Sequence, residues 1–158
     1  MIKSNEDPRC PVYGGRLKRK DWVKRCSKQI GGEKEWLLIE RRKCTNPSCR
    51  KTHRLLPDMC IPYKQYESGI IEDVIDGTLD EDALCEEESP CESTLKRWRK
   101  WAESFLKNVE GHIRSAAYRI LELSDEFLSS GRPLLKELKE RIGYGWLSAA
   151  IRIYINTG

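Results

Sequence analysis

The sequence predicts an α+β protein, with a small N-terminal β module followed by a mainly α-helical part. Residues 22–30 and 35–43 have the composition of two strands, and the pair Gly31-Gly32 between them supplies the positive φ angles that tight hairpin turns need. From residue 66 onwards, apolar side chains recur instead at three- and four-residue steps, which is the period of a helix.

Cysteines flank the predicted hairpin on both sides. Cys10 opens the run Cys-Pro-Val-Tyr-Gly-Gly, and Cys44 and Cys49 enclose a second loop. Paired thiolates in such tight loops chelate zinc, and two loops together make the closed tetrahedral site of a structural zinc ion. Residues 52–57 are expected to form a third short strand. Because loop, hairpin, loop and strand follow in the order of a zinc ribbon, residues 8–64 are predicted to be a zinc-ribbon-like module.

The predicted zinc site lacks one thiolate, because Tyr13 stands where the second cysteine of the first loop would be. His53, four residues after Cys49, is the candidate that joins the three cysteines as a ligand. Cys26 and Cys60 are further donors in the same module. Two other arrangements remain open: a fourth position taken by water or a thiol, and a ribbon without zinc that packs around Tyr13.

Charge is distributed in blocks, although the net charge of the 158-residue chain is only +4. Residues 1–64 carry 17 Lys/Arg and 7 Asp/Glu, and residues 93–158 carry 12 and 7. Between them, residues 65–92 carry 11 acids and no base. Such blocks often mark surfaces for a polyanion, with solubility and internal charge balance as the alternative interpretation.

The chain shows no sign of a membrane span or a secretory signal. No apolar run approaches the length of about 18 residues that a membrane helix needs, and the polar residues 1–9 lack an apolar segment. Seven cysteines without a signal peptide favour a reducing, cytoplasmic location and metal binding over disulfides.

Residues 65–106 are predicted to contain a helix-turn-helix. Helices are expected over residues 66–76 and 79–86, and a third helix is expected to begin with Ser89 as its cap and Pro90 at its first position. The recognition helix of this motif places its N-terminal side chains in the major groove. The residues expected to contact DNA are Ser93, Thr94, Lys96, Arg97, Arg99 and Lys100, whereas those expected on the buried face are Leu95, Trp98, Ala102 and Phe105.

The remaining residues, 107–158, are predicted to be helical. One amphipathic helix is expected to run through Leu128, a break follows at residues 129–133, and two further helices cover residues 134–142 and 146–155. This apolar stripe predicts either core packing or the seam of a homodimer.

Several of these motifs together resemble a family of Firmicutes proteins that is known only as a domain of unknown function. The resemblance spans about residues 8–156, and its most specific parts are His-Arg-Leu-Leu-Pro-Asp and the Pro-Tyr-Lys segment that follows. It implies a zinc ribbon joined to a helix-turn-helix, similarity to the N-terminal parts of transposases, and occurrence near mobile elements and prophages. The family usually has cysteine at the position of Tyr13.

These observations predict a non-enzymatic DNA-binding protein of a mobile element or prophage. Arg41, Arg42 and Lys43 of the ribbon are expected to bind DNA together with the helix, through salt-dependent phosphate contacts. The alternative is a protein-interaction module of a phage or host regulator, in which the acidic and helical surfaces bind a protein partner. Catalysis is not expected, because no transposase catalytic domain is recognisable. The cysteines that might serve a thiol enzyme, Cys60, Cys85 and Cys91, have no His and acid set nearby in sequence.

Overall fold

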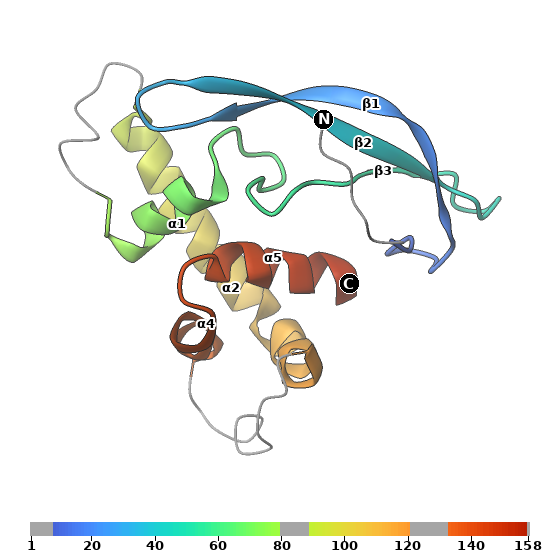
Figure 1. The fold of residues 1–158 in the computed structure, drawn as a ribbon. Coiled ribbons are helices and arrows are strands. Elements are labelled where there is room, and N and C mark those ends of the chain that lie inside the picture. The colour runs from blue at the N-terminus through green and yellow to red at the C-terminus, as the bar shows by residue number, and fades with distance from the viewer. Residues whose placement is uncertain (1–7, 80–88, 121–132, 158) are drawn as a thin grey trace.

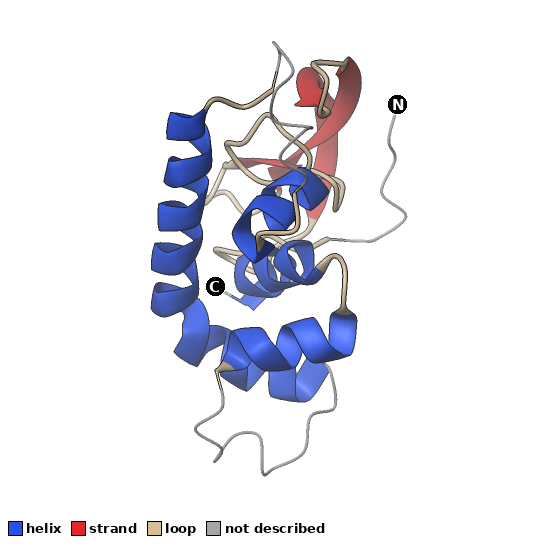
Figure 2. Ribbon diagram, turned by 90° about the vertical axis from the view of Figure 1, so that its left-hand side faces the viewer, coloured by secondary structure: helices blue, strands red, loops and turns tan. Residues whose placement is uncertain are grey.

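The structure is a computed structural model that describes residues 8–79, 89–120 and 133–157. Its elements in chain order are β1 (Leu17–Lys28), β2 (Lys34–Cys44), β3 (Thr52–Arg54), α1 (Ser68–Asp76), α2 (Glu92–Ile120), α4 (Leu134–Ile142) and α5 (Trp146–Thr157). The sheet lies over one side of the helical part (Figures 1 and 2). The predicted order of a β module followed by helices is therefore confirmed.

The three strands form one antiparallel sheet in the order β1-β2-β3. Leu17 pairs with Cys44 at one end of the sheet, and Lys28 pairs with Lys34 beside the hairpin turn at the other. β1 thus begins at residue 17 rather than at 22, because the ladder continues through a basic segment that has no apolar alternation. It is interrupted only by a register shift between Arg19 and Asp21.

The helices share one hydrophobic core. Its buried members are Ile61, Ile70, Ile71, Val74, Leu95, Trp98, Leu138, Trp146, Leu147, Ala150, Ile151 and Ile153. Figure 2 shows the long helix α2 beside the shorter helices. The predicted burial of Leu95, Trp98 and Ala102 is confirmed. This core draws residues from both predicted helical regions, 65–106 and 107–158.

Two of the predicted helix limits are wrong or lie outside the described residues. α2 begins at Glu92 and not at Pro90, and the residue before it is Cys91, whose carbonyl oxygen accepts hydrogen bonds from the amides of Thr94 and Leu95. Residues 80–88, in which most of the predicted middle helix of the helix-turn-helix falls, are not described, nor are residues 121–132. The helix-turn-helix therefore stays a prediction.

Backbone hydrogen bonds join the sheet to the helices. The Lys28 amide donates to the carbonyl oxygen of Gln65 at 2.8 Å, and the Glu67 amide donates to the carbonyl oxygen of Lys28 at 3.2 Å. The last residue of β1 is thus paired with the segment that leads into α1. Among the described helices, none is both long and apolar enough to cross a membrane.

Candidate metal centre and basic surface

The three predicted cysteine ligands converge at the end of the sheet that lies opposite the hairpin turn. The sulfur atoms of Cys10, Cys44 and Cys49 all lie within 4.8 Å of one another. The Sγ atoms of Cys10 and Cys49 lie 3.6 Å apart. Cys10 and Cys44 are buried and Cys49 is half-buried. The trio can therefore hold a metal ion.

Among the described residues, the group of ligand atoms that all lie within 4.8 Å of one another contains the three cysteines and not His53, but His53 lies beside one of them. Its Nε2 atom lies 3.4 Å from Sγ of Cys10. β3 positions the ring, since His53 pairs with Arg42 on β2. Burial, and then the charge of Lys51, lower the pKa of His53, which favours the neutral imidazole that metals bind.

The other residues considered for the fourth position lie elsewhere. The Tyr13 side chain is 50% exposed, so the first loop is not packed around its ring. Cys26 pairs with Trp36 nearer the hairpin end of the sheet. Cys60 packs in a separate apolar cluster with Leu37 and Ile39.

Backbone amides point at the sulfurs in both cysteine loops. Burial raises the pKa of the Cys10 thiol, but hydrogen bonds from the amides of Val12 and Tyr13 and from the neighbouring thiols outweigh it, so the net pKa is lowered. The Asn46 amide donates to Sγ of Cys44 at 3.4 Å, although burial keeps the pKa of that thiol raised. Amide hydrogen bonds of this kind stabilise thiolates, the form that binds metal.

The backbone of these loops also needs left-handed residues and close approach. Gly14 has φ of +63° and Arg50, which follows Cys49, has φ of +48°. A Cβ atom on Gly15 would lie 3.1 Å from Sγ of Cys44, closer than nearly all real Cβ contacts. The absence of a side chain at Gly15 therefore lets the two loops meet.

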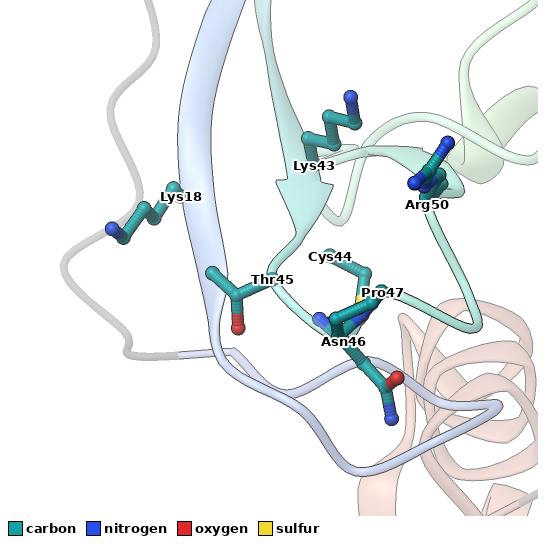
Figure 3. A pocket seen from close by; sticks show the side chains of 7 residues that line it. All are labelled: Lys18, Lys43, Cys44, Thr45, Asn46, Pro47 and Arg50. Carbon is teal, nitrogen blue, oxygen red and sulfur yellow. The ribbon is translucent and has the colours of Figure 1, made fainter.

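A shallow hollow of about 430 Å³ lies beside the second cysteine loop (Figure 3). It is lined by Lys18, Lys43, Cys44, Thr45, Asn46, Pro47 and Arg50. Figure 3 shows that its three cationic side chains point outwards in different directions. Among the described residues, no carboxylate forms an ion pair with any of these cations. The hollow is thus rimmed by charges that are available to an extended anion. We call Lys18, Lys43 and Arg50 the rim cations.

Two of the ribbon arginines that were predicted to contact DNA are held in internal ion pairs. The guanidinium of Arg41 pairs with Asp21 on β1. That of Arg42 donates to Oε1 of the buried Glu40 at 2.8 Å, and Arg19 donates to the same oxygen at 3.3 Å. Arg42 is only 14% exposed, so the structure leaves Lys43 as the accessible member of the predicted trio.

The first turns of α2 hold most of their polar side chains in local contacts. The hydroxyl oxygens of Ser93 and Thr94 lie 3.2 and 3.3 Å from Sγ of Cys91. Lys96 pairs with Glu92 at 2.7 Å. These two hydroxyls and this ammonium are exposed or half-exposed, but each has a neighbour on its own helix.

The three remaining bases of the predicted recognition helix differ in whether their side chains have a hydrogen-bond or ion-pair partner. Arg97 donates to the carbonyl and hydroxyl oxygens of the first turn, and Arg99 donates to the carbonyl oxygen of Val74 at 3.3 Å. Lys100 is exposed and has no ion-pair partner within the described part of the chain. The first turns of α2 lie towards the hairpin end of the sheet, since Tyr66 contacts both Lys28 and Trp98, whereas Lys43 lies next to Cys44 at the opposite end.

Sequence reasoning missed Lys18 and Arg50 as companions of Lys43. The register Lys18↔Lys43 brings the first two together, and Arg50 follows a cysteine that the same loop folds back. If the two strands had been aligned so that Leu17 faces Cys44, this alignment would have placed Lys18 opposite Lys43.

The fold and the site define a small α+β protein whose sheet ends in a cysteine-rich candidate metal centre. Residues 10–98, more than half of the chain, match the family described as a domain of unknown function (DUF6431), and the chain belongs to this family. The predicted membership of a family of unknown function is thus confirmed, while Firmicutes origin and similarity to transposases stay predictions. No curated protein and no solved structure matches the chain.

Proposed function

We propose that this protein is a non-enzymatic DNA-binding protein whose ribbon is held together by a structural zinc ion. Three thiolates and one imidazole are a common ligand set of structural zinc. With Zn–S bonds of about 2.3 Å and Zn–N bonds of about 2.0 Å, tetrahedral geometry sets ligating atoms about 3.5–3.8 Å apart. The separations of 3.6 Å between the Sγ atoms of Cys10 and Cys49 and of 3.4 Å between Sγ of Cys10 and Nε2 of His53 are close to these values.

The observation that carries the DNA-binding proposal is the set of rim cations beside this centre. Lys18, Lys43 and Arg50 come from β1, β2 and the second cysteine loop, and all three are exposed. Because zinc would fix the loop that bears Arg50, it would also fix the spacing of the three charges. Spread charges on a rigid support suit a phosphate backbone, which offers one anion per nucleotide along its length.

Lys100 and Arg97 on α2 are the second set of bases in this proposal. Arg41 and Arg42 are assigned a supporting role, because their ion pairs hold the strand that carries Lys43. A helix-turn-helix, a homodimer through the C-terminal helices and a mobile-element or prophage context remain parts of the same hypothesis.

Metal content of the purified protein tests the zinc part. We expect one zinc ion per chain, and we expect His53→Ala to weaken zinc binding while His53→Cys retains it. Tyr13→Phe is the matched control, because an exposed ring that does not ligate should leave zinc affinity unchanged. If His53→Ala and wild type bind zinc with equal affinity, His53 is not a zinc ligand.

Gel shifts at two salt concentrations test the DNA part. Reversing the rim cations together (Lys18→Glu, Lys43→Glu, Arg50→Glu) should weaken duplex binding and reduce the salt slope by about one for each lost phosphate contact. Lys136→Glu is the control, because Lys136 is an exposed base on α4 and does not belong to the sheet or the cysteine loops that carry the rim cations. A wild-type protein that binds no DNA at low salt would contradict the proposal.

The alternative, a protein-interaction module, draws on a different surface. Trp36 is 65% exposed, and Leu38, two residues further along β2 and hence on the same face, is also exposed. Exposed apolar residues on one face of a sheet can mark a protein-binding surface. Partner binding that Trp36→Ala abolishes, in a chain that binds no DNA, would favour this alternative.

A further inference from the structure

Tyr63 is presented to solvent in an unusual way. Its side chain is as exposed as in an extended peptide, at 101%. Its backbone has φ of +63°, in the left-handed region that a residue with a Cβ atom rarely adopts. Two independent unfavourable features, a solvated aromatic ring and a strained backbone, thus coincide at one residue.

The surrounding chain holds Tyr63 in this conformation. The Lys64 amide donates to the carbonyl oxygen of Ile61 at 3.2 Å, which closes a turn around Tyr63. From β1, the Arg25 guanidinium donates to the carbonyl oxygens of both Ile61, at 2.6 Å, and Lys64. Ile61 itself is buried in the helical core. Because both ends of the turn are anchored, the strain is maintained by the fold, as is typical of functional positions.

Cations lie beside this turn. Nζ of Lys64 sits 4.6 Å from the centre of the Trp101 ring on α2. Arg97 lies four residues before Trp101 on α2 and hence on the same side of the helix. Burial, and then the charge of Arg97, lower the pKa of Lys64, which agrees with two cations on this side of α2. Among the described residues, no carboxylate forms an ion pair with Lys64 or Arg97. An anion placed between them would relieve this repulsion.

We propose that Tyr63, Lys64 and Arg97 form a binding site for single-stranded nucleic acid, in which the Tyr63 ring stacks on an unpaired base and the two cations bind the adjacent phosphate. This inference rests on the proposed nucleic-acid binding and adds the kind of strand that one surface takes. We call these three residues the stacking site.

The combination of groups favours a single strand over a duplex. A base in a duplex has both faces covered by its neighbours, whereas an unpaired base can stack on a free aromatic ring. Aromatic rings next to a cationic groove are the usual means of binding single strands without sequence preference. The stacking site lies near the hairpin end of the sheet, since Lys28 and Tyr66 are in contact there, and the rim cations lie at the opposite end.

Fluorescence anisotropy with two probes tests the inference: fluorescein-labelled (dT)20 and a labelled 20-base-pair duplex. We expect Tyr63→Ala and Tyr63→Gly to weaken (dT)20 binding by roughly 5- to 150-fold, the range found when one stacked base loses its aromatic partner. Tyr63→Phe keeps the ring and should bind within about twofold of wild type. Duplex binding, which the rim cations support, should change by less than about twofold in all three variants.

Tyr63→Gly also separates binding from folding. Glycine adopts positive φ without strain, so this variant should unfold at the same temperature as wild type or higher while it binds (dT)20 weakly. Tyr144→Ala is the matched control, because Tyr144 is another exposed tyrosine, on the loop between α4 and α5. It should leave (dT)20 binding unchanged.

The outcomes distinguish this inference from the proposed function. If Tyr63→Ala and Tyr63→Gly bind (dT)20 as wild type does, or if Tyr63→Phe binds as weakly as Tyr63→Ala, ring stacking is overturned. A wild-type protein that binds the duplex but not (dT)20 overturns the stacking site and leaves DNA binding intact. A protein that binds neither probe at low salt overturns both.

Discussion

Cys91, the residue before α2, has an exposed thiol whose pKa is strongly perturbed. Hydrogen bonds from the Ser93 hydroxyl and then from the Thr94 hydroxyl and amide lower its pKa to about 7. At pH 7 about half of this exposed thiol is therefore thiolate, against a few per cent for an ordinary cysteine. We expect iodoacetamide to label Cys91 with a half-maximal rate near pH 7, as followed by peptide mass spectrometry.

Two comparisons make this expectation specific. Ser93→Ala removes the strongest of the hydrogen bonds and should move the midpoint of labelling to higher pH. Cys60 should label slowly at every pH in this range, because burial raises the pKa of its thiol. A midpoint near pH 8.5 in both wild type and Ser93→Ala would show that the helix start does not stabilise the thiolate.

Glu40 is a buried carboxylate on β2, and its ionisation should make stability depend on pH. The hydrogen bond from Arg42 lowers the pKa of Glu40, burial opposes this shift, and Arg19 adds to it. A lowered folded-state pKa means that the stabilisation is present above the ordinary pKa of about 4.3 and is lost as pH falls through the lower folded value. We expect Glu40→Gln to reduce the free energy of unfolding at pH 7 by about 1–3 kcal/mol, and the difference from wild type to shrink below about pH 4.

Urea denaturation of both proteins across this pH range measures that difference. Asp21→Asn is the control, because it removes the partner of Arg41 from a more exposed ion pair, which stabilises the fold less than a buried one. If the difference in unfolding free energy between wild type and Glu40→Gln stays constant down to pH 3, the charge of Glu40 is not what stabilises the strand.

At the scale of elements, the start of α5 depends on a carboxylate from α1. The buried Glu72 accepts hydrogen bonds from the amides of Gly145, at 2.7 Å, and Leu147, at 3.0 Å. Gly145 directly precedes α5 and Leu147 lies in its first turn, where backbone amides have no acceptor within the helix. Burial raises the pKa of Glu72, although the two amides act in the opposite direction.

Glu72→Ala should therefore destabilise the helical core. It would leave two amide groups without an acceptor, that of Leu147 in a buried position and that of Gly145 in a half-buried one, which we expect to cost about 2–3 kcal/mol of unfolding free energy. Glu72→Gln, whose carbonyl oxygen can accept from only one amide with good geometry, should have a free energy of unfolding between those of wild type and Glu72→Ala. Urea denaturation followed by far-UV circular dichroism measures the difference. Unchanged stability of Glu72→Ala would show that water can replace the carboxylate there.

Short-range sequence patterns predicted individual helices and strands, but they did not predict contacts between side chains that lie far apart in the sequence. The helix over residues 134–142 was predicted with the limits of α4, because its apolar period and the glycine after it lie within one short segment. The convergence of Cys10 with Cys44 and Cys49 followed from a hairpin that returns the chain to its starting end. Glu72 gave no such signal, because its partners on α5 are more than seventy residues away.

The same limit applies to the charged residues of the candidate sites. In sequence, Arg41 and Arg42 belong to a basic run that is typical of a DNA contact. The cross-strand register places Asp21 opposite Arg41, so the ion pair between them follows from strand pairing and not from the basic run itself. Tyr63 is part of the Pro-Tyr-Lys segment, yet only the backbone shows that its ring is held in solvent.

At the scale of the whole molecule, hydrophobic packing is unevenly distributed. The helical part has a core of many buried apolar residues. At the cysteine end of the sheet, the described residues of the buried cluster are Cys10, Leu17 and Cys44, with Cys49 packed against it. One leucine among cysteines buries too little apolar surface to order two loops, so a bound metal ion would supply much of the free energy that orders this end.

Metal removal should therefore loosen one end of the molecule and leave the rest intact. After chelation with EDTA, we expect faster hydrogen exchange at amides that join the cysteine loops, such as Thr45, which donates to Arg16, and Cys44, which donates to Lys51. The Leu147 amide, held by Glu72 in the helical part, should exchange at its original rate. Cys44→Ser should reproduce the effect of EDTA, and Cys26→Ser should not, since Cys26 lies along β1 away from the cluster. Equal protection of Thr45 with and without metal would show that packing and hydrogen bonds alone hold the cysteine loops.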